Sequence, residues 1–168
     1  MFPSSTYPLP SRELQQLLAS FPQAVAEELS RISIIRRWSD GEVVLHGGAV
    51  VPSVAMLLEG RLRLAASCED GEEVLFRWFI RGEFVGMASA VGGLPFLVDA
   101  IAVGDCCTAH FDRSKLLNIL ESDARAALVA AKQISQSAFD MTRLVIARSE
   151  PTLAARVDAV LLRLAGHN

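Results

Sequence analysis

The stretch "LLEGRLRLAASCEDGEEVLFRWFIRGEFVG", residues 57–86, carries the signal that decides the fold. Polar and apolar residues alternate in Arg61–Leu64, with the period of two of a β-strand, and Glu72–Phe79 also fits a strand. Asp70-Gly71 lies between the two segments and is a strong signal for a tight hairpin turn. The stretch therefore predicts two antiparallel strands. One face of the second strand carries Val74, Phe76 and Trp78.

The same period of two extends in both directions, from Trp38 to Phe111. Turn signals interrupt it at short intervals, as expected between short strands. These signals are Ser39-Asp40-Gly41, His46-Gly47-Gly48, Glu59-Gly60, Asp70-Gly71, Arg81-Gly82 and Gly104-Asp105. Many short strands joined by regular turns predict a double-stranded β-helix, that is, a jelly-roll barrel.

Helical patterns flank this region on both sides. Residues 11–32 repeat apolar residues at helix spacing with a break at Phe21-Pro22, which predicts two short helices. After the strands, "DRSKLLNILES" is typical of a short capped helix, and residues 123–149 form one helical run without glycine or proline. We therefore expect an α+β protein, mainly β, in which short helices precede the barrel and a long helix follows it.

Two apolar stripes run along the long helix. Leu128, Ser135, Phe139 and Ile146 form one of them, and a second stripe with alternating spacings of three and four lies beside it. A helix that is apolar on two sides can cover the barrel with one side and meet a second copy with the other. We expect the second stripe to form the seam of a homodimer. Its residues are Ala127, Ala131, Ile134, Ala138, Met141 and Val145.

The composition limits the possible partners. The chain has 168 residues, of which 51% are apolar, and this suffices for one domain with a real core. Its net charge of -3 lacks the basic excess of a nucleic-acid binder, so residues 1–168 are not expected to bind DNA. Three cysteines without the spacing of a disulfide framework favour a reducing compartment, and no apolar run is long enough for a membrane span. A cytoplasmic protein is expected.

Five motifs, in their order along the chain, resemble those of the Crp/Fnr family of bacterial transcription regulators, and the resemblance covers residues 21–166. The motifs are "SDGEVVLHGG", "LLEGRLRL", "EDGEE", "GEFVG" and "ARVDAVLLRLA". No single one is specific, so the resemblance rests on all five occurring in the family's order. It implies an N-terminal jelly roll that binds a cyclic nucleotide, a dimerisation helix, and a winged helix-turn-helix that reads DNA.

The resemblance also implies a division of the chain. We expect a flexible tail in residues 1–10, a sensor domain in residues 11–122 and a dimerisation helix in residues 123–149. Residues 150–168 are then a hinge helix that leads to a DNA-binding domain absent from this chain. The expected partners are a second copy and, through the missing winged helix-turn-helix, DNA; no membrane partner is expected.

The nucleotide site of the family is altered in this chain. In members that bind cyclic AMP, a glutamate follows the "GEFVG" motif and an arginine lies further along the loop; these positions correspond here to Met87 and to Phe96 or Leu97. No arginine or lysine occurs between Gly82 and Asp112. A buried phosphate would lack its charged partner, which costs several kcal/mol, so we expect no specific binding of cyclic AMP. The candidate effector-pocket residues are Gly86, Met87, Ala88, Ser89, Phe96, Leu97, Met141 and Thr142.

Two interpretations of this apolar loop are open: its residues fill the emptied pocket, or they line a cavity for an apolar effector or haem. His46, His110 and His167 do not lie at ligand spacing, so no metal or other cofactor is expected. The absence of an H-x-H pair, a P-loop or a Ser/His/Asp arrangement argues against an enzyme. The alternative to a regulator is a stand-alone jelly-roll module that binds a ligand or another protein.

Overall fold

The computed structural model describes residues 11–67 and 73–149. The predicted tail (1–10) and hinge helix (150–168), together with Cys68 and the Asp70-Gly71 turn, lie outside the described residues. The chain divides into two compact units, Met1–Ile134 and Ser135–Asn168, and each is described by itself. The first unit holds the sheet.

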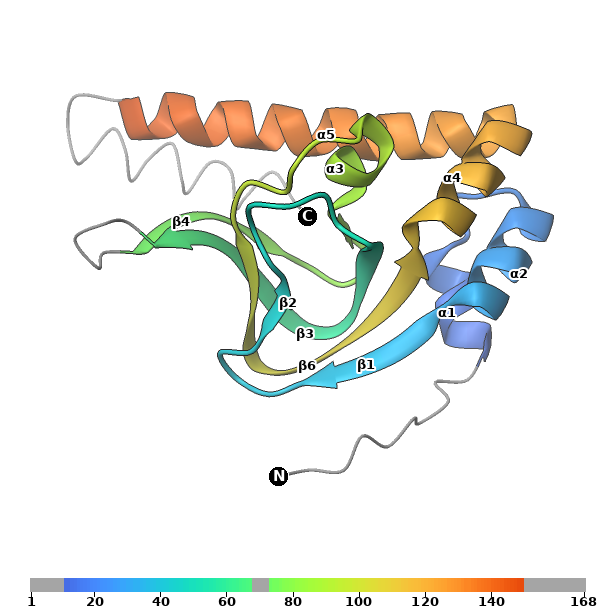
Figure 1. Ribbon diagram of the computed structural model, residues 1–168, viewed down its shortest axis with the longest axis horizontal. Coiled ribbons are helices and arrows are strands. Elements are labelled where there is room, and N and C mark those ends of the chain that lie inside the picture. The colour runs from blue at the N-terminus through green and yellow to red at the C-terminus, as the bar shows by residue number, and fades with distance from the viewer. Residues whose placement is uncertain (1–10, 68–72, 150–168) are drawn as a thin grey trace. The chain divides into compact units, whose positions relative to one another are not determined.

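Six strands form one antiparallel sheet (Figure 1). They are β1 (Ile34–Trp38), β2 (Val43–Leu45), β3 (Ser53–Ser67), β4 (Glu73–Phe79), β5 (Phe84–Val85) and β6 (Asp99–Asp112). The long strands β3 and β6 pair with each other at the centre, while β1 and β2 pair with successive parts of β6, and β5 and β4 with successive parts of β3. Because each long strand passes from one short partner to another, the sheet curls. The predicted mainly β, jelly-roll fold is confirmed.

Two of the predicted turns are wrong. Glu59-Gly60 and Gly104-Asp105 lie inside β3 and β6, and do not separate shorter strands. The register between the two strands shifts on both sides of Glu59, and both glycines have positive φ, 82° at Gly60 and 67° at Gly104. A glycine with positive φ can accommodate a bulge that bends a strand without ending it. The glycines therefore mark bends in two long strands.

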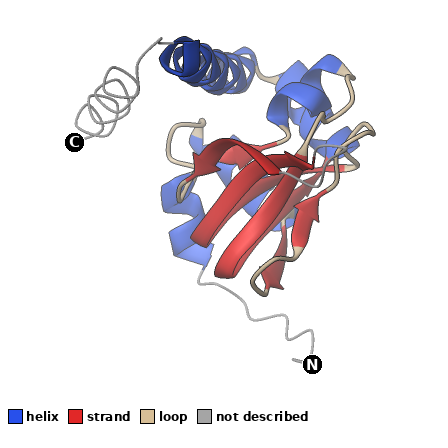
Figure 2. Cartoon of the chain, turned by 90° about the vertical axis from the view of Figure 1, so that its left-hand side faces the viewer, coloured by secondary structure: helices blue, strands red, loops and turns tan. Residues whose placement is uncertain are grey.

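Within the described residues, the helices are α1 (Ser11–Leu17), α2 (Gln23–Ile32), α3 (Met87–Gly92), α4 (Arg113–Ser122) and α5 (Ala124–Ser149). Figure 1 shows α1, α2 and α4 together at one end of the strands. In Figure 2 the helices of the first unit lie outside the curled sheet. The predicted cap of α4 is confirmed, because the Asp112 carboxylate accepts a hydrogen bond from the Lys115 N–H at 3.0 Å. The helix α3 was not predicted.

A chain of polar side chains is buried between β1, β6 and β3. The Trp38 indole N–H donates to the Thr108 hydroxyl oxygen at 2.8 Å, and His110 Nε2 lies 3.0 Å from the same oxygen. His110 Nδ1 lies 3.0 Å from Ser53 Oγ. Burial, the larger cause, and the nearby charge of Arg36 together lower the pKa of His110 to about 4. The imidazole is therefore neutral in the folded protein at pH 7.

We expect acidification to destabilise the fold through His110. Its pKa is lowered in the folded state, so the unfolded chain takes up a proton first, and the stabilisation present above pH 6.5 is lost as the pH falls toward 4. The full effect is about 3 kcal/mol. Urea unfolding of the wild type and of His110→Gln across this range measures it. A pH dependence that is the same in both proteins contradicts the assignment to His110.

Candidate effector site

The predicted ligand loop contains the short helix α3, which follows β5 directly. Gly86 precedes α3 with a φ of 86°, a conformation that suits glycine. A Cβ at this position would lie 3.1 Å from Leu45 Cδ1 and 3.4 Å from Val51 Cγ2, so the backbone here packs closely against the barrel wall. The glycines of the loop therefore serve packing and backbone conformation.

The loop is fixed by bonds to itself. The Ser89 hydroxyl donates to the carbonyl oxygen of Leu94, and the Ser89 carbonyl oxygen accepts from the backbone N–H groups of Gly93 and Leu94. These bonds close the C-terminal end of α3. Ser89 has the one hydroxyl group in residues 87–98, and this hydroxyl donates its hydrogen within the loop itself.

A second set of bonds ties the loop to the segment between β2 and β3. The Phe96 N–H donates to the Ala49 carbonyl at 2.8 Å, and the Gly48 N–H donates to the Phe96 carbonyl at 2.7 Å. The Gly47 N–H donates to the Asp99 carboxylate at 2.7 Å. The loop is therefore ordered by the protein's own contacts.

The predicted pocket residues of the loop fall into two groups. Met87 and Ser89 are buried and Phe96 is half-buried against the core, as a filled pocket requires. Ala88 is exposed, and Leu97 is 84% exposed. Leu94 and Val91 are also exposed, to smaller extents. The interpretation that the whole apolar loop fills the pocket is therefore wrong for these exposed residues. Successive residues of a helix point in different directions, so the residues of α3 and of the turn after it cannot all face one cavity.

The loop itself has no cation, but the Arg113 guanidinium contacts it and the Arg77 guanidinium contacts Glu83, just before it. The Arg113 guanidinium donates from Nε to the Ala90 carbonyl at 2.9 Å, at the C-terminal end of α3. The Arg77 guanidinium lies 2.7 Å from Glu83 Oε1 and 4.3 Å from the centre of the Phe79 ring. Both guanidinium groups are bonded to protein acceptors. Sequence reasoning missed them because they come from α4 and β4.

The position of Arg77 also corrects the expected orientation of β4. Arg77 and Phe79 are 9% and 4% exposed, whereas Trp78 is 39% exposed. The register between β3 and β4 shifts between Leu64 and Ala65, and Arg77 pairs with Leu64. The apolar face read from the sequence, with Phe76 and Trp78, is thus the more exposed one. Arg77 could have been recognised from its alternation with Phe79.

The residues predicted on the long helix are placed along α5. Ala127 and Ile134 are half-buried and Ala131 is exposed; Ile134 packs against the core of the first unit, as do Val129 and the buried Ala126 and Ala130. In the second unit Ala138, Thr142 and Val145 are exposed and Met141 is half-buried. The Thr142 hydroxyl donates to the Ala138 carbonyl at 2.9 Å.

The cysteines of β6, Cys106 and Cys107, are adjacent in sequence and both buried. Burial, the largest cause, together with the neighbouring Cys107 thiol and the charges of Glu42 and Asp105, raises the pKa of the Cys106 thiol to about 12. Burial also raises the pKa of Cys107. Such thiols stay protonated at neutral pH and are poor metal ligands. Within the described residues, no three His, Cys, Asp or Glu side chains are grouped to hold a metal ion.

Residues 35–123, more than half of the chain, match the family described as cyclic nucleotide-binding domain, and the chain belongs to this family. The family is one of regulatory and sensor domains, and its members' fold is the curled sheet described above. No curated protein matches the sequence. Over the part of the chain that the structure covers, no helix combines the length and apolar composition needed to cross a membrane.

Solved structures with the same fold include transcription regulators. The c-di-GMP-responsive global regulator CLP of Xanthomonas campestris is 22% identical with a TM-score of 0.69, over 83% of this chain and 70% of that one. The sensor domain of the regulator DNR from Pseudomonas aeruginosa is 20% identical with a TM-score of 0.65, over 85% and 97%. The cAMP-bound regulatory domain of Toxoplasma gondii PKA is 14% identical with a TM-score of 0.63, over 74% of this chain and half of that one. These likenesses show that the chain shares its fold with these proteins.

Proposed function

We propose that the chain is the sensor and dimerisation region of a Crp/Fnr-like transcription regulator whose nucleotide site no longer binds cyclic AMP. The observation that carries the proposal is the combination of a family-type jelly roll with a ligand loop whose polar groups are bonded to the protein itself. Residues 11–122 are the sensor domain, residues 123–149 the dimerisation helix and residues 150–168 the hinge. The location is the cytoplasm.

The chemistry of the loop supports the loss of nucleotide binding. Met87 stands where a carboxylate would accept from a ribose hydroxyl, and it is buried among apolar residues. The nearest described guanidinium at α3 belongs to Arg113, which is bonded to the Ala90 carbonyl. A nucleotide phosphate would have to enter a site that offers no cation from the loop, and desolvation would then oppose binding.

We expect cyclic AMP and cyclic GMP to bind with dissociation constants above about 1 mM, which corresponds to less than about 4 kcal/mol of binding free energy. Isothermal titration calorimetry of the full chain measures this directly. Restoring the two family residues in Met87→Glu/Phe96→Arg is expected to leave binding weak, because Met87 is packed into the core and its volume is already filled. Micromolar affinity of the wild type for either nucleotide contradicts the proposal.

The exposed face of α5 supports a dimer. Within this helix Leu128, Ala131, Ser135, Ala138, Thr142 and Val145 are all exposed, and they follow the three-four spacing of a coiled-coil seam. Three of these residues, Ala131, Ala138 and Val145, belong to the predicted seam, while Ile134 is engaged with the core of its own unit. We therefore place the seam on the exposed set. Small residues at its centre allow two helices to approach closely.

We propose that the whole regulator binds DNA through a winged helix-turn-helix outside residues 1–168. Residues 1–168 alone have a net charge of -3 and are expected not to bind a specific sequence. Fluorescence anisotropy with the chain alone and with its downstream residues appended tests this division. Specific binding gained only on extension supports the regulator; its absence in both proteins supports the stand-alone module.

The exposed apolar residues of the loop favour a second function, the recognition of an apolar effector. Val91, Leu94 and Leu97 are 43%, 63% and 84% exposed and lie in a loop held in place by Ser89 and Phe96. Native mass spectrometry and an absorption spectrum of the purified chain test for such an effector, haem included. A mass that matches the bare chain, with no Soret band, leaves the loop without a bound effector and contradicts this second function.

A further inference from the structure

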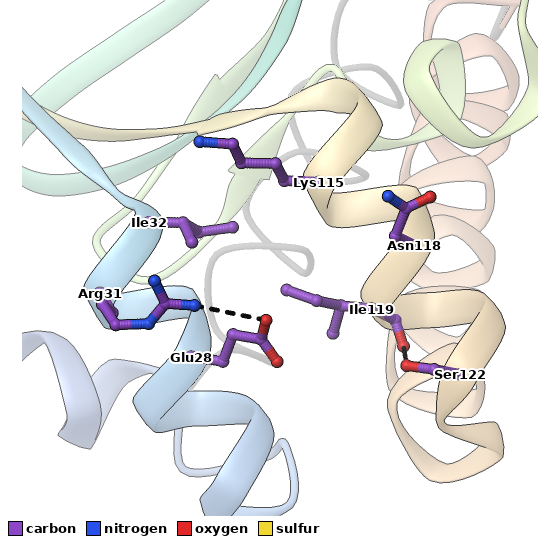
Figure 3. A pocket seen from close by; sticks show the side chains of 7 residues that line it. All are labelled: Glu28, Arg31, Ile32, Lys115, Asn118, Ile119 and Ser122. Carbon is purple, nitrogen blue, oxygen red and sulfur yellow. Dashed lines mark hydrogen bonds and ion pairs between the residues drawn. The ribbon is translucent and has the colours of Figure 1, made fainter.

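A surface hollow of about 370 Å³ lies in the first unit between α2 and α4, away from the ligand loop (Figure 3). Residues one turn apart line it from each helix, so each helix presents one face to it. The lining residues are Glu28, Arg31 and Ile32 of α2, and Lys115, Asn118, Ile119 and Ser122 of α4. The function proposed above uses none of them.

Two isoleucines, Ile32 and Ile119, line the hollow beside its polar residues. Figure 3 shows Ile32 and Ile119 pointing toward each other from the two helices. Ile119 is 5% exposed and belongs to the core of the unit, and the half-buried Ile32 packs against the same core. Both side chains are therefore held in place from behind, and the half-buried Ile32 offers most of the fixed apolar surface that a ligand can contact.

The rim of the hollow is charged, with a cationic excess. Arg31 and Lys115 carry positive charges and Glu28 one negative charge, so the lining has a net charge of +1 in a chain of net charge -3. Arg31 lies 3.6 Å from Glu28, but their side chains are 73% and 49% exposed, so this pair is weak. The Arg31 guanidinium can therefore pair with a second anion that enters the hollow.

The size of the hollow indicates whether its ligand is a protein or a small molecule. Stable protein interfaces engage roughly 20–30 residues on each side, far more than line this hollow, whereas ligand pockets begin near ~300 Å³. A metal ion is a poor match because Glu28 is the one carboxylate in the lining. The dimensions therefore fit a compact organic molecule.

We propose that the hollow binds a small organic anion whose apolar body rests on Ile32 and Ile119 and whose carboxylate pairs with Lys115 and Arg31. Asn118 supplies an amide for a further hydrogen bond. The Ser122 hydroxyl donates to the Ile119 carbonyl at 2.9 Å, so its oxygen is left as an acceptor. Because the hollow is open to solvent, binding is weak, with a dissociation constant on the order of 1 mM.

The test uses the two lysines of the chain, Lys115 and Lys132. Reductive methylation with ¹³C-formaldehyde keeps both charges and gives each lysine an NMR signal, assigned with Lys132→Gln. Benzoate is the probe; benzyl alcohol lacks its charge and acetate its apolar body. We expect benzoate to shift the Lys115 signal saturably and the exposed Lys132 signal on α5 not at all, with weaker effects from the other two compounds.

A matched pair of variants completes the test while Lys115 remains the reporter. Arg31→Gln is expected to weaken benzoate binding about two- to five-fold, the effect of one exposed ion pair, whereas Arg125→Gln, which removes an exposed charge at the start of α5, leaves it unchanged. Equal shifts at both lysines, equal effects of acetate and benzoate, or equal affinities of the two variants overturn the proposal.

Discussion

The double substitution Ala138→Glu/Val145→Glu is expected to convert a dimeric chain into a monomer. Both side chains are exposed and lie one heptad apart on the proposed seam of α5, so a two-fold dimer would bring four new carboxylates together between closely packed helices. Lost packing and like-charge repulsion should raise the dimer dissociation constant at least about a thousandfold, or about 4 kcal/mol. Sedimentation equilibrium measures the change.

A control with the same charge change separates the seam from the rest of the helix. Gln136→Glu/Arg143→Gln also makes each chain more negative by two charges, at exposed positions outside the three-four pattern. This variant should remain dimeric, with unchanged helix content by circular dichroism. If both double variants dissociate equally, general charge repulsion explains the result; if the wild type is itself monomeric, the seam does not exist.

The second large effect is expected at Gly60. Its φ is 82°, and an added Cβ would lie 2.6 Å from both the Asp105 carbonyl oxygen and Cys106 Cβ. Backbone atoms of the paired strand cannot move aside without breaking the β3–β6 register. Gly60→Ala should therefore cost about 4 kcal/mol, the sum of an unfavourable φ and an overpacked contact, and lower the melting temperature by roughly 10 °C.

Gly41→Ala is the matched control for the steric part. Gly41 has nearly the same φ, 80°, but an added Cβ there meets nothing within 4 Å. This substitution should cost about 1 kcal/mol, from backbone conformation alone. Equal destabilisation of the two variants in urea would show that the close approach of β6 to Gly60 contributes nothing.

Much of the fold could be predicted from local patterns. Residues 11–32, on either side of the break at Phe21-Pro22, and residues 123–149 show helix spacing, and Asp112 provides a cap at a position where the strand pattern stops. These signals depend on neighbours within a few residues, so the sequence displays them directly. The alternation around Arg61–Leu64 indicates a strand for the same reason.

The features that were predicted wrongly depend on contacts with residues that are distant in sequence. A glycine such as Gly60 signals a turn or a bulge equally well, and only pairing with β6 decides between them. The site differs from expectation for a similar reason: Arg113 lies 23 residues from Ala90, and Arg77 lies in β4, outside the loop. Loop composition alone could not reveal either cation.

The bond between Arg113 and Ala90 has a mechanical consequence. Asp112 closes the first turn of α4 with its carboxylate, and Arg113, the next residue, holds the far end of α3 with its side chain. A displacement of α3 must therefore either break the 2.9 Å contact or pull the first turn of α4 along with it. Arg113 therefore couples α3 mechanically to α4, directly beside the residue that caps α4.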